Sequence, residues 1–209
     1  GCTQVPLEFD SYDSIFVVFR KKSGHDRNNG PNAPTWRQAQ VISGPWDVSF
    51  NPAWGGPKKP VRFDALTSWA DHNDSGIKHY SGKAVYRTNF SLADGLSGKP
   101  LALELGDVKD VGIARVTLNG IDLGVVWRPP FRADISKAVK PGDNKLEVMV
   151  VNSWRNRLIG DNKLPEHKRL TKTNIRVIER TESSRLTKWE LEESGLLGPV
   201  RITEKITVN

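Results

Sequence analysis

The sequence predicts an all-β fold, an antiparallel β-sandwich of the jelly-roll type. Short runs of alternating apolar residues recur between turn signals, and very little of the chain shows helical periodicity. The strongest turn signal is Asn119-Gly120, which separates two β-rich runs at 114–118 and 121–127. A type I′ turn needs positive φ at both central residues, and Asn and Gly tolerate it best. We therefore predict a tight hairpin within the sandwich.

Length and composition fit such a domain. The chain has 209 residues, of which 37% are hydrophobic and 26% are charged, as in ordinary soluble globular proteins. This length suffices for one large β domain with its own core, or for one domain plus part of a neighbour. No apolar run approaches the ~20 residues of a transmembrane helix, so we predict no transmembrane segment. The first residues also lack the basic and apolar segments of a signal peptide.

Turn residues divide the chain into predicted strands. Residues 46–50 begin the sandwich, and further strands are predicted at 61–64, 76–92, 101–105, 145–151, 175–178 and 194–202. Ser81-Gly82 interrupts the longest of these, which indicates a bulge. Residues 106–110 are predicted to form a turn.

The N-terminal part differs from the rest. Residues 5–21 predict two strands, and residues 23–35 hold many turn formers and few apolar groups, which indicates a linker. We therefore divide the chain at residue 44. Residues 1–43 are strands that belong to, or remain from, a preceding β domain, with the linker, and residues 44–209 form the jelly roll. The alternative is that the first part donates a strand to the sandwich.

Four motifs carry a resemblance to a known family. They are Val-x-Leu-Asn-Gly-x-x-Leu-Gly at 116–124, Trp-x-Pro-Pro-Phe at 127–131, Asn-x-Leu-x-Val at 144–148 and Asn-Arg-Leu-Ile-Gly-Asp at 156–161. Their order resembles the C-terminal galactose-binding-like β-sandwich of bacterial α-L-rhamnosidases of glycoside hydrolase family 106. It is more loosely similar to the sugar-binding jelly roll of glycoside hydrolase family 2. In the resembled family the catalytic carboxylates belong to an upstream (β/α)8 barrel.

The single cysteine, Cys2, excludes an internal disulfide. It is either a terminal residue without a role or the lipid-bearing first residue of a mature bacterial lipoprotein. Together with the resemblance, this predicts a periplasmic or extracellular protein, anchored through Cys2 under the second alternative.

The formal net charge is +7, and a basic balance can indicate a nucleic-acid or anionic-polymer partner. The charges are scattered, however. The local runs, such as Lys21-Lys22, Lys58-Lys59 and Lys168-Arg169, are too short to form a stripe. A solvated surface is the better interpretation, and we predict no nucleic-acid partner.

Catalysis is not indicated within this chain. Glycoside hydrolysis usually needs two facing carboxyl groups, about 5 Å apart for retention and wider for inversion. The chain has 24 acidic residues, and none stands in a context that marks such a pair. Glu104 and Glu147 lie within strands at polar-face spacing, which predicts surface positions. We predict no catalytic residue.

Metal ligands are weakly indicated. His72 and His79 form no closed zinc pattern with other ligands. Asp107 and Asp110, near the predicted turn, are candidate ligands for a structural calcium, because calcium prefers oxygen donors. An ordinary polar turn is the alternative interpretation. No other cofactor is predicted.

Sugar binding is the best-supported chemistry. Sugars place their C–H faces on aromatic rings and their hydroxyls on Asn, Asp and Arg side chains. Candidate ligand-binding residues combine strand-end tryptophans with a polar cluster: Trp69, Trp127, Asn152, Trp154, Asn156, Arg157 and Asp161. Two alternatives stay open. Arg157 and Asp161, four residues apart in a helical turn, can pair with each other, and the segment can fasten the sandwich to a neighbouring domain. Trp36 and Trp46 are expected in the core.

These observations lead to one hypothesis and two alternatives. The hypothesis is a non-catalytic accessory module, carbohydrate-binding or scaffolding, of a rhamnosidase-type glycoside hydrolase acting on plant-type or bacterial polysaccharides. Its partners would be carbohydrate and the catalytic domain of the same polypeptide. The alternatives are a self-sufficient glycosidase and a basic nucleic-acid or anionic-polymer binder.

Overall fold

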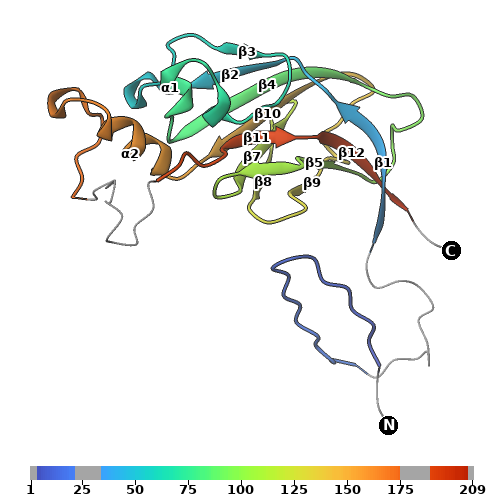
Figure 1. Ribbon diagram of the computed structural model, residues 1–209. Helices are drawn as coiled ribbons and strands as arrows, with labels where there is room; N and C mark the ends of the chain where they lie inside the picture. Colours follow the sequence, from blue (N-terminus) through green and yellow to red (C-terminus); the bar gives the residue numbers. More distant parts are fainter. Residues whose placement is uncertain (1–3, 22–33, 175–188, 207–209) are drawn as a thin grey trace.

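A computed structural model describes residues 4–21, 34–174 and 189–206, and it confirms the predicted antiparallel β-sandwich. Two large sheets pack face to face, and the longer helix lies beyond one end of them (Figure 1). Neighbouring strands pair antiparallel throughout. No helix in the described ranges is long and apolar enough to cross a membrane.

One sheet has six strands in the order β3-β2-β4-β10-β7-β8. Their bounds are Trp46–Phe50 (β2), Val61–Phe63 (β3), Lys83–Leu92 (β4), Ile113–Leu118 (β7), Ile121–Val126 (β8) and Gly142–Val151 (β10). Tyr86 on β4 pairs with Val148 on β10, which pairs with Val116 on β7. All three side chains are buried. Because strand side chains alternate, the residues between them form the outward face.

The second sheet has four strands in the order β1-β12-β5-β9, and a two-stranded sheet joins β11 to β6. Their bounds are Thr35–Ile42 (β1), Leu101–Glu104 (β5), Asp107–Lys109 (β6), Arg132–Asp134 (β9), Gly195–Gly198 (β11) and Val200–Ile206 (β12). The prediction of a plain turn at 106–110 was wrong. Three of these residues form a strand because the distant residues of β11 pair with them.

The helices are short. They are Ser75–Lys78 (α1), Arg155–Asn162 (α2) and three 3-10 turns, Pro52–Trp54 (η1), Trp69–Asp71 (η2) and Glu166–Lys168 (η3). Helix α1 lies within the stretch predicted as the longest strand, which in fact begins only at Lys83. The Asp74 side chain starts α1 by accepting hydrogen bonds from the amides of Gly76 and Ile77.

The predicted hairpin is confirmed. Asn119 and Gly120 have φ values of 53° and 81°, as a type I′ turn requires. The Asn119 side-chain amide also donates to the Ala138 carbonyl and to Asn144 Oδ1, both at 2.8 Å. The same asparagine therefore forms the turn and ties it to the loop that leads into β10.

The core lies between the two large sheets and includes several rings. Trp46 is fully buried, as predicted, and Trp69 is equally buried, with its indole Nε1 donating to the Tyr86 hydroxyl at 2.5 Å. Phe50 packs edge-on against both Trp69 and Tyr80. Burying such side chains stabilises the fold by about 1.5–3 kcal/mol each.

Glu104 is not a surface residue, which corrects the sequence prediction. Its side chain accepts from Arg132 at 2.6 Å and from Arg201 at 2.8 Å, and the residue is only 4% exposed. All four residues of β5 are buried, so alternation along this strand does not mark an exposed face. Trp36, expected in the core, is half-buried, and the Arg132 guanidinium lies 4.6 Å from its ring centre.

Residues 4–21 contain no strand, in contrast to the two strands predicted there. They form an extended loop that projects from the sandwich (Figure 1), with Asp13 paired to Arg128. Many of its apolar side chains are exposed, Phe16 to 93%. Strand β1 lies before residue 44, yet it pairs with β12, as the strand-donation alternative anticipates. Most of the predicted linker and the predicted strand at 175–178 lie outside the described residues.

Candidate binding site beside helix α2

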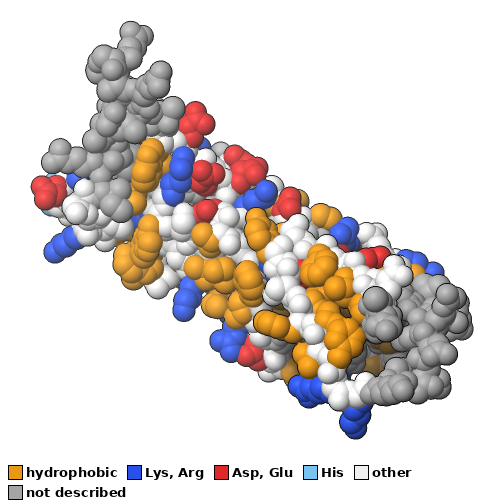
Figure 2. Space-filling model, turned by 90° about the horizontal axis from the view of Figure 1, so that it is seen from below, with side chains coloured by type: hydrophobic (Ala, Val, Ile, Leu, Met, Phe, Trp, Pro, Cys, Tyr) orange, Lys and Arg blue, Asp and Glu red, His pale blue; other side chains and the backbone are white. Residues whose placement is uncertain are grey.

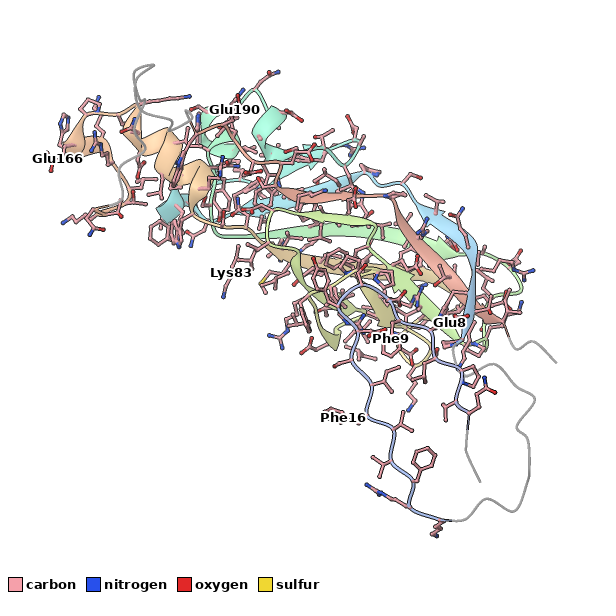
Figure 3. All side chains as sticks on the ribbon, turned by 60° about the horizontal axis from the view of Figure 1, so that its bottom comes forward. Glu8, Phe9, Phe16, Lys83, Glu166 and Glu190 are labelled. Carbon is pink, nitrogen blue, oxygen red and sulfur yellow. The ribbon has the colours of Figure 1, made fainter. Side chains whose placement is uncertain are left out.

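The segment after β10 carries most of the predicted site residues and lies at one end of the sandwich (Figure 1). Glu166 and Glu190 lie at this end, whereas Phe16 lies on the N-terminal loop, away from it (Figure 3). The predicted helical turn at 157–161 is confirmed as part of α2. The aromatic, apolar and polar groups of this end meet around one pocket.

Trp154 forms one wall of this pocket, which we call the aromatic pocket. It is 47% exposed and packs edge-on against Trp54, with ring centres 4.8 Å apart. The pocket has a volume of about 320 Å³. Its lining consists of Trp54, Trp154, Leu158, Leu170, Thr171, Lys172 and Thr173. The exposed Trp154 ring, the partly buried Trp54, two leucines and a threonine-rich rim suit a ligand with both apolar and hydroxyl surfaces.

Local backbone chemistry places Trp54. The Asn51 side chain accepts from the Ala53 amide at 2.9 Å and so caps η1, and Gly55 ends it with a φ of 82°. A Cβ at Gly55 would lie 2.9 Å from Leu170 Cδ1 and 3.0 Å from Arg157 Nη1. Glycine is thus required here both for its conformation and for the close approach of the opposite wall.

Asp161 fixes that opposite wall. Its Oδ2 accepts from the Leu170 amide at 3.1 Å, the Thr171 amide at 2.7 Å and the Thr171 hydroxyl at 2.6 Å. Its Oδ1 lies 3.0 Å from Arg157 Nε, an ion pair without the alignment of a hydrogen bond. Burial raises the pKa of Asp161, but these hydrogen bonds and Arg157 outweigh it, so the pKa is lowered. The predicted Arg157–Asp161 pairing is therefore confirmed.

Asn152 and Asn156 are buried and already bonded. Asn152 accepts from the Gly82 amide and donates to the Tyr80 carbonyl, both at 2.9 Å. Asn156 donates to the Glu192 carbonyl at 2.8 Å and accepts from its amide at 2.9 Å. Arg157 is only 5% exposed. None of the four polar candidates lines the pocket: Asp161, paired with Arg157, holds its wall, whereas Asn152 and Asn156 hold backbone elsewhere at this end.

The other two candidate tryptophans lie elsewhere. Trp69 has no exposed surface, so its ring is unavailable to a sugar, contrary to the prediction of ligand contact. Trp127 is 62% exposed, but it lines a different hollow, with Asp10 and Arg132 among its neighbours. Trp127 and Trp154 follow strands that end at the same end of the six-stranded sheet, with β7 between them. Of the predicted residues, only Trp154 is brought into the aromatic pocket.

His79, which the sequence analysis weighed only as a zinc ligand, is a buried neighbour of this cluster. Its Nδ1 lies 3.0 Å from the Ser75 carbonyl oxygen and its Nε2 lies 3.4 Å from Lys163 Nζ. Nδ1 therefore carries the ring proton and donates it to the Ser75 carbonyl, and Nε2 accepts from Lys163. Burial lowers the pKa of His79, and the nearby charges of Lys163 and Arg157 lower it further, against the Ser75 bond that raises it. His79 is therefore neutral at pH 7.

The calcium candidates do not converge. Asp107 is exposed, and Asp110 accepts from the Ser153 amide at 2.9 Å. Among the residues that the structure describes, no group of three or more His, Cys, Asp or Glu side chains could hold a metal ion. Asp110 therefore has a structural partner already, at the start of the segment that leads into α2.

Comparison with known proteins adds an independent finding, although no protein-family model matches the chain. A protein of Formosa agariphila named "Putative beta-glucuronidase" is 43% identical over 183 residues, which are 79% of this chain and 16% of that protein. A solved rhamnosidase of Novosphingobium sp. PP1Y matches with a TM-score of 0.73 and 35% identity, over 89% of this chain and 17% of that one. A β-glucuronidase of Ruminococcus gnavus matches at a TM-score of only 0.45, too low to carry an argument.

The fold and these matches define the class: a β-sandwich domain associated with glycoside hydrolases. The chain spans about a sixth of the length of the Formosa protein and of the Novosphingobium rhamnosidase, at 16% and 17%. Three observations carry this conclusion: the antiparallel sheets, the sequence identity and the small share of each relative that is covered.

Proposed function

We propose that this chain is a non-catalytic accessory module of a rhamnosidase-type glycoside hydrolase that acts on plant-type or bacterial polysaccharides. The observation that carries the proposal is the match to the Novosphingobium rhamnosidase, which extends over 89% of this chain but only 17% of that enzyme. The module belongs to the α-L-rhamnosidases of glycoside hydrolase family 106. Its partners are the catalytic domain of the same polypeptide and carbohydrate.

The aromatic pocket is the proposed carbohydrate contact. The exposed Trp154 ring offers an apolar face for sugar C–H groups, while Thr171 offers a hydroxyl at the rim. Asp161 holds Thr171 in place through its amide and its hydroxyl, so the pocket is formed before a ligand arrives. A preformed wall reduces the ordering that binding would otherwise require.

The test is glycan retention by Trp154→Ala. The purified protein is run through native gels that contain plant or bacterial polysaccharides, and its retardation is compared with that of the variant. We expect retardation of the parent protein and weaker retardation of the variant. The control is Phe16→Ala, which removes an exposed aromatic ring from the N-terminal loop (Figure 3). Equal retardation of parent and Trp154→Ala would reject this pocket.

The scaffolding role rests on residues 4–21. This loop exposes apolar side chains on both limbs, including Phe9 at 56% and Phe19 at 70%. Apolar side chains also gather on the face of the molecule seen in Figure 2. Exposed apolar surface of this kind usually marks an interaction site. We propose that the loop pairs with the preceding β domain of the same polypeptide.

Localisation follows from the same proposal. A polysaccharide-active enzyme would meet its substrate in the periplasm or outside the cell, with lipidation of Cys2 as the means of anchoring. Mass spectrometry of the native protein would detect the lipid, and an unmodified Cys2 would reject the anchor.

The alternative, a self-sufficient glycosidase, would need two facing carboxylates. Asp47 and Glu147 line the same hollow on the outward face of the six-stranded sheet. Both pair across the sheet with Arg87, and Arg87 already donates to Glu147 at 2.8 Å, so this carboxylate is held in an ion pair. We therefore expect no turnover of aryl rhamnosides by this chain. Turnover that Glu147→Gln abolishes would overturn the accessory role.

A further inference from the structure

The outward face of the six-stranded sheet carries a second hollow region, separate from the aromatic pocket. Two hollows of about 650 and 550 Å³ share Asn89 and Lys145 in their linings. Because these residues line both hollows, the two hollows adjoin, and together we call them the trough across β4 and β10. It begins near Pro45 and Asp47 and ends near Lys140.

Strand register builds the floor of this trough. Arg87 on β4 pairs with Asp47 on β2 and with Glu147 on β10, and the next row outward pairs Asn89 with Lys145. The intervening residues, such as Tyr86 and Leu146, are buried in the core. Alternation therefore points both polar rows to the same exposed face.

The floor and the rim are held by hydrogen bonds. Arg87 donates to Glu147 at 2.8 Å and to the Ser49 hydroxyl at 3.1 Å. At the rim, the buried Asn144 accepts from the Lys140 amide and donates to the Lys140 carbonyl, both at 2.8 Å. The trough thus keeps its shape without a ligand, which favours binding.

The charges of the lining identify the chemistry of the ligand. Three cationic side chains, Arg87, Lys140 and Lys145, face three anionic ones, Asp47, Asp143 and Glu147. A polyanion would gain little from this balance, since it would meet as many carboxylates as cations. Vicinal hydroxyls, in contrast, donate to carboxylates and accept from ammonium and guanidinium groups, and Asn89 can do both. Among the described residues, Lys145 and Lys140 form no ion pair and so remain available as donors.

We propose that this trough binds an extended, neutral glycan chain lying across β4 and β10. The proposal goes beyond the aromatic pocket, because the trough has no lining residue in common with it. The trough contacts several consecutive sugar units through hydrogen bonds, whereas the aromatic pocket contacts an apolar sugar face. A module with both sites holds a polysaccharide at two points.

The experiment uses isothermal titration calorimetry with neutral oligosaccharides from galactomannan, xylan and β-glucan, and with oligogalacturonate as the acidic arm. The test variant is Asn89→Ala with Lys145→Ala, which removes the two shared residues. We expect at least one neutral oligosaccharide to bind the parent protein and its affinity to fall about tenfold in the double variant. Phe16→Ala, on the N-terminal loop and outside both proposed sites, should retain this binding.

The matched control is Lys83→Ala. Like Lys145 on β10, Lys83 on β4 is an exposed lysine of the six-stranded sheet, but it lies outside the trough (Figure 3). Its loss removes the same charge, so an equal effect of Lys83→Ala would indicate general electrostatics and overturn the trough. Binding of oligogalacturonate alone, weakening steeply with salt, would also overturn it. If Trp154→Ala lost all binding and the double variant lost none, the trough would be rejected and the aromatic pocket would stand.

Discussion

Two Arg–carboxylate pairs of this protein lie in opposite environments. Beside α2, Arg157 Nε and Asp161 Oδ1 are 3.0 Å apart, and the side chains are 6% and 4% exposed. On the outward sheet face, Arg87 Nε and Glu147 Oε2 are 2.8 Å apart, and the side chains are 50% and 41% exposed. The chemistry and distance are alike, yet water screens only the second pair strongly. The first pair therefore organises the fold, and the second can exchange its partners for a ligand.

The largest expected effect comes from breaking the buried pair. Asp161→Ala should lower the free energy of unfolding by about 3 kcal/mol, because it leaves Arg157 buried without its partner and releases Leu170 and Thr171. Urea unfolding followed by tryptophan fluorescence measures the change. Glu147→Ala is the matched control on the sheet face, and its cost should stay below about 1 kcal/mol. Equal losses in the two variants would remove the distinction between the pairs.

The same contrast explains what the sequence could and could not predict. Alternation and the Asn119-Gly120 turn predicted the sandwich and its central hairpin, because both depend on neighbouring residues. Helix α2 and the Arg157–Asp161 pair were also within reach, since i,i+4 spacing is local. Burial is not local. Trp69, Asn152 and Asn156 have the composition of a sugar site, yet packing from distant segments covers them.

The residues that were missed depend on contacts between distant segments. Trp54 meets Trp154 because η1 packs against the start of α2, a hundred residues further along the chain. The partner of β6 is β11, and no spacing in either segment indicates that pairing. Likewise, alternation placed Glu104 on a surface, but Arg132 and Arg201 cover it from neighbouring strands. Sequence patterns identify which face of a strand is polar without showing whether that face meets water.

A second, smaller effect is expected where the aromatic pocket wall approaches Gly55. Gly55→Ala should cost about 2 kcal/mol, because the new methyl group would crowd Leu170 and Arg157 at a φ of 82°. Gly142 has a similar φ of 72°, but a methyl group there would meet no atom within 4 Å. Gly142→Ala should therefore cost about 1 kcal/mol from backbone strain alone. Thermal unfolding compares the two variants. A smaller loss for Gly55→Ala would show that the wall yields easily.

The pH dependence of stability separates the buried cluster from the exposed face. The folded state lowers the pKa of His79, so the unfolded state binds the proton more readily. Stability from this group is present above its unfolded pKa of about 6.5 and is lost as the pH falls below that value. The pKa of Asp161 is also lowered, so its contribution is lost at more acidic pH, below about 3.9. We expect unfolding free energy to decrease in two steps on acidification.

His79→Gln tests the first of these steps. Glutamine cannot titrate, so the variant should lose the pH dependence that begins below about 6.5 and keep the more acidic step. Chemical unfolding at a series of pH values provides the measurement. An unchanged first step in the variant would show that another group carries it.

The smallest expected effect is on nucleic-acid binding, for which we expect none at physiological salt. The net charge of +7 favours such binding only if the cations are free and clustered. Most of the described arginines instead form ion pairs with carboxylates, and the cations of the sheet-face trough alternate with acids. Fluorescence anisotropy with a labelled DNA duplex over a salt series measures this directly. Tight binding that weakens steeply with salt would show that the exposed face binds DNA through its net charge. It would contradict the expectation that ion pairing and alternating signs prevent such binding.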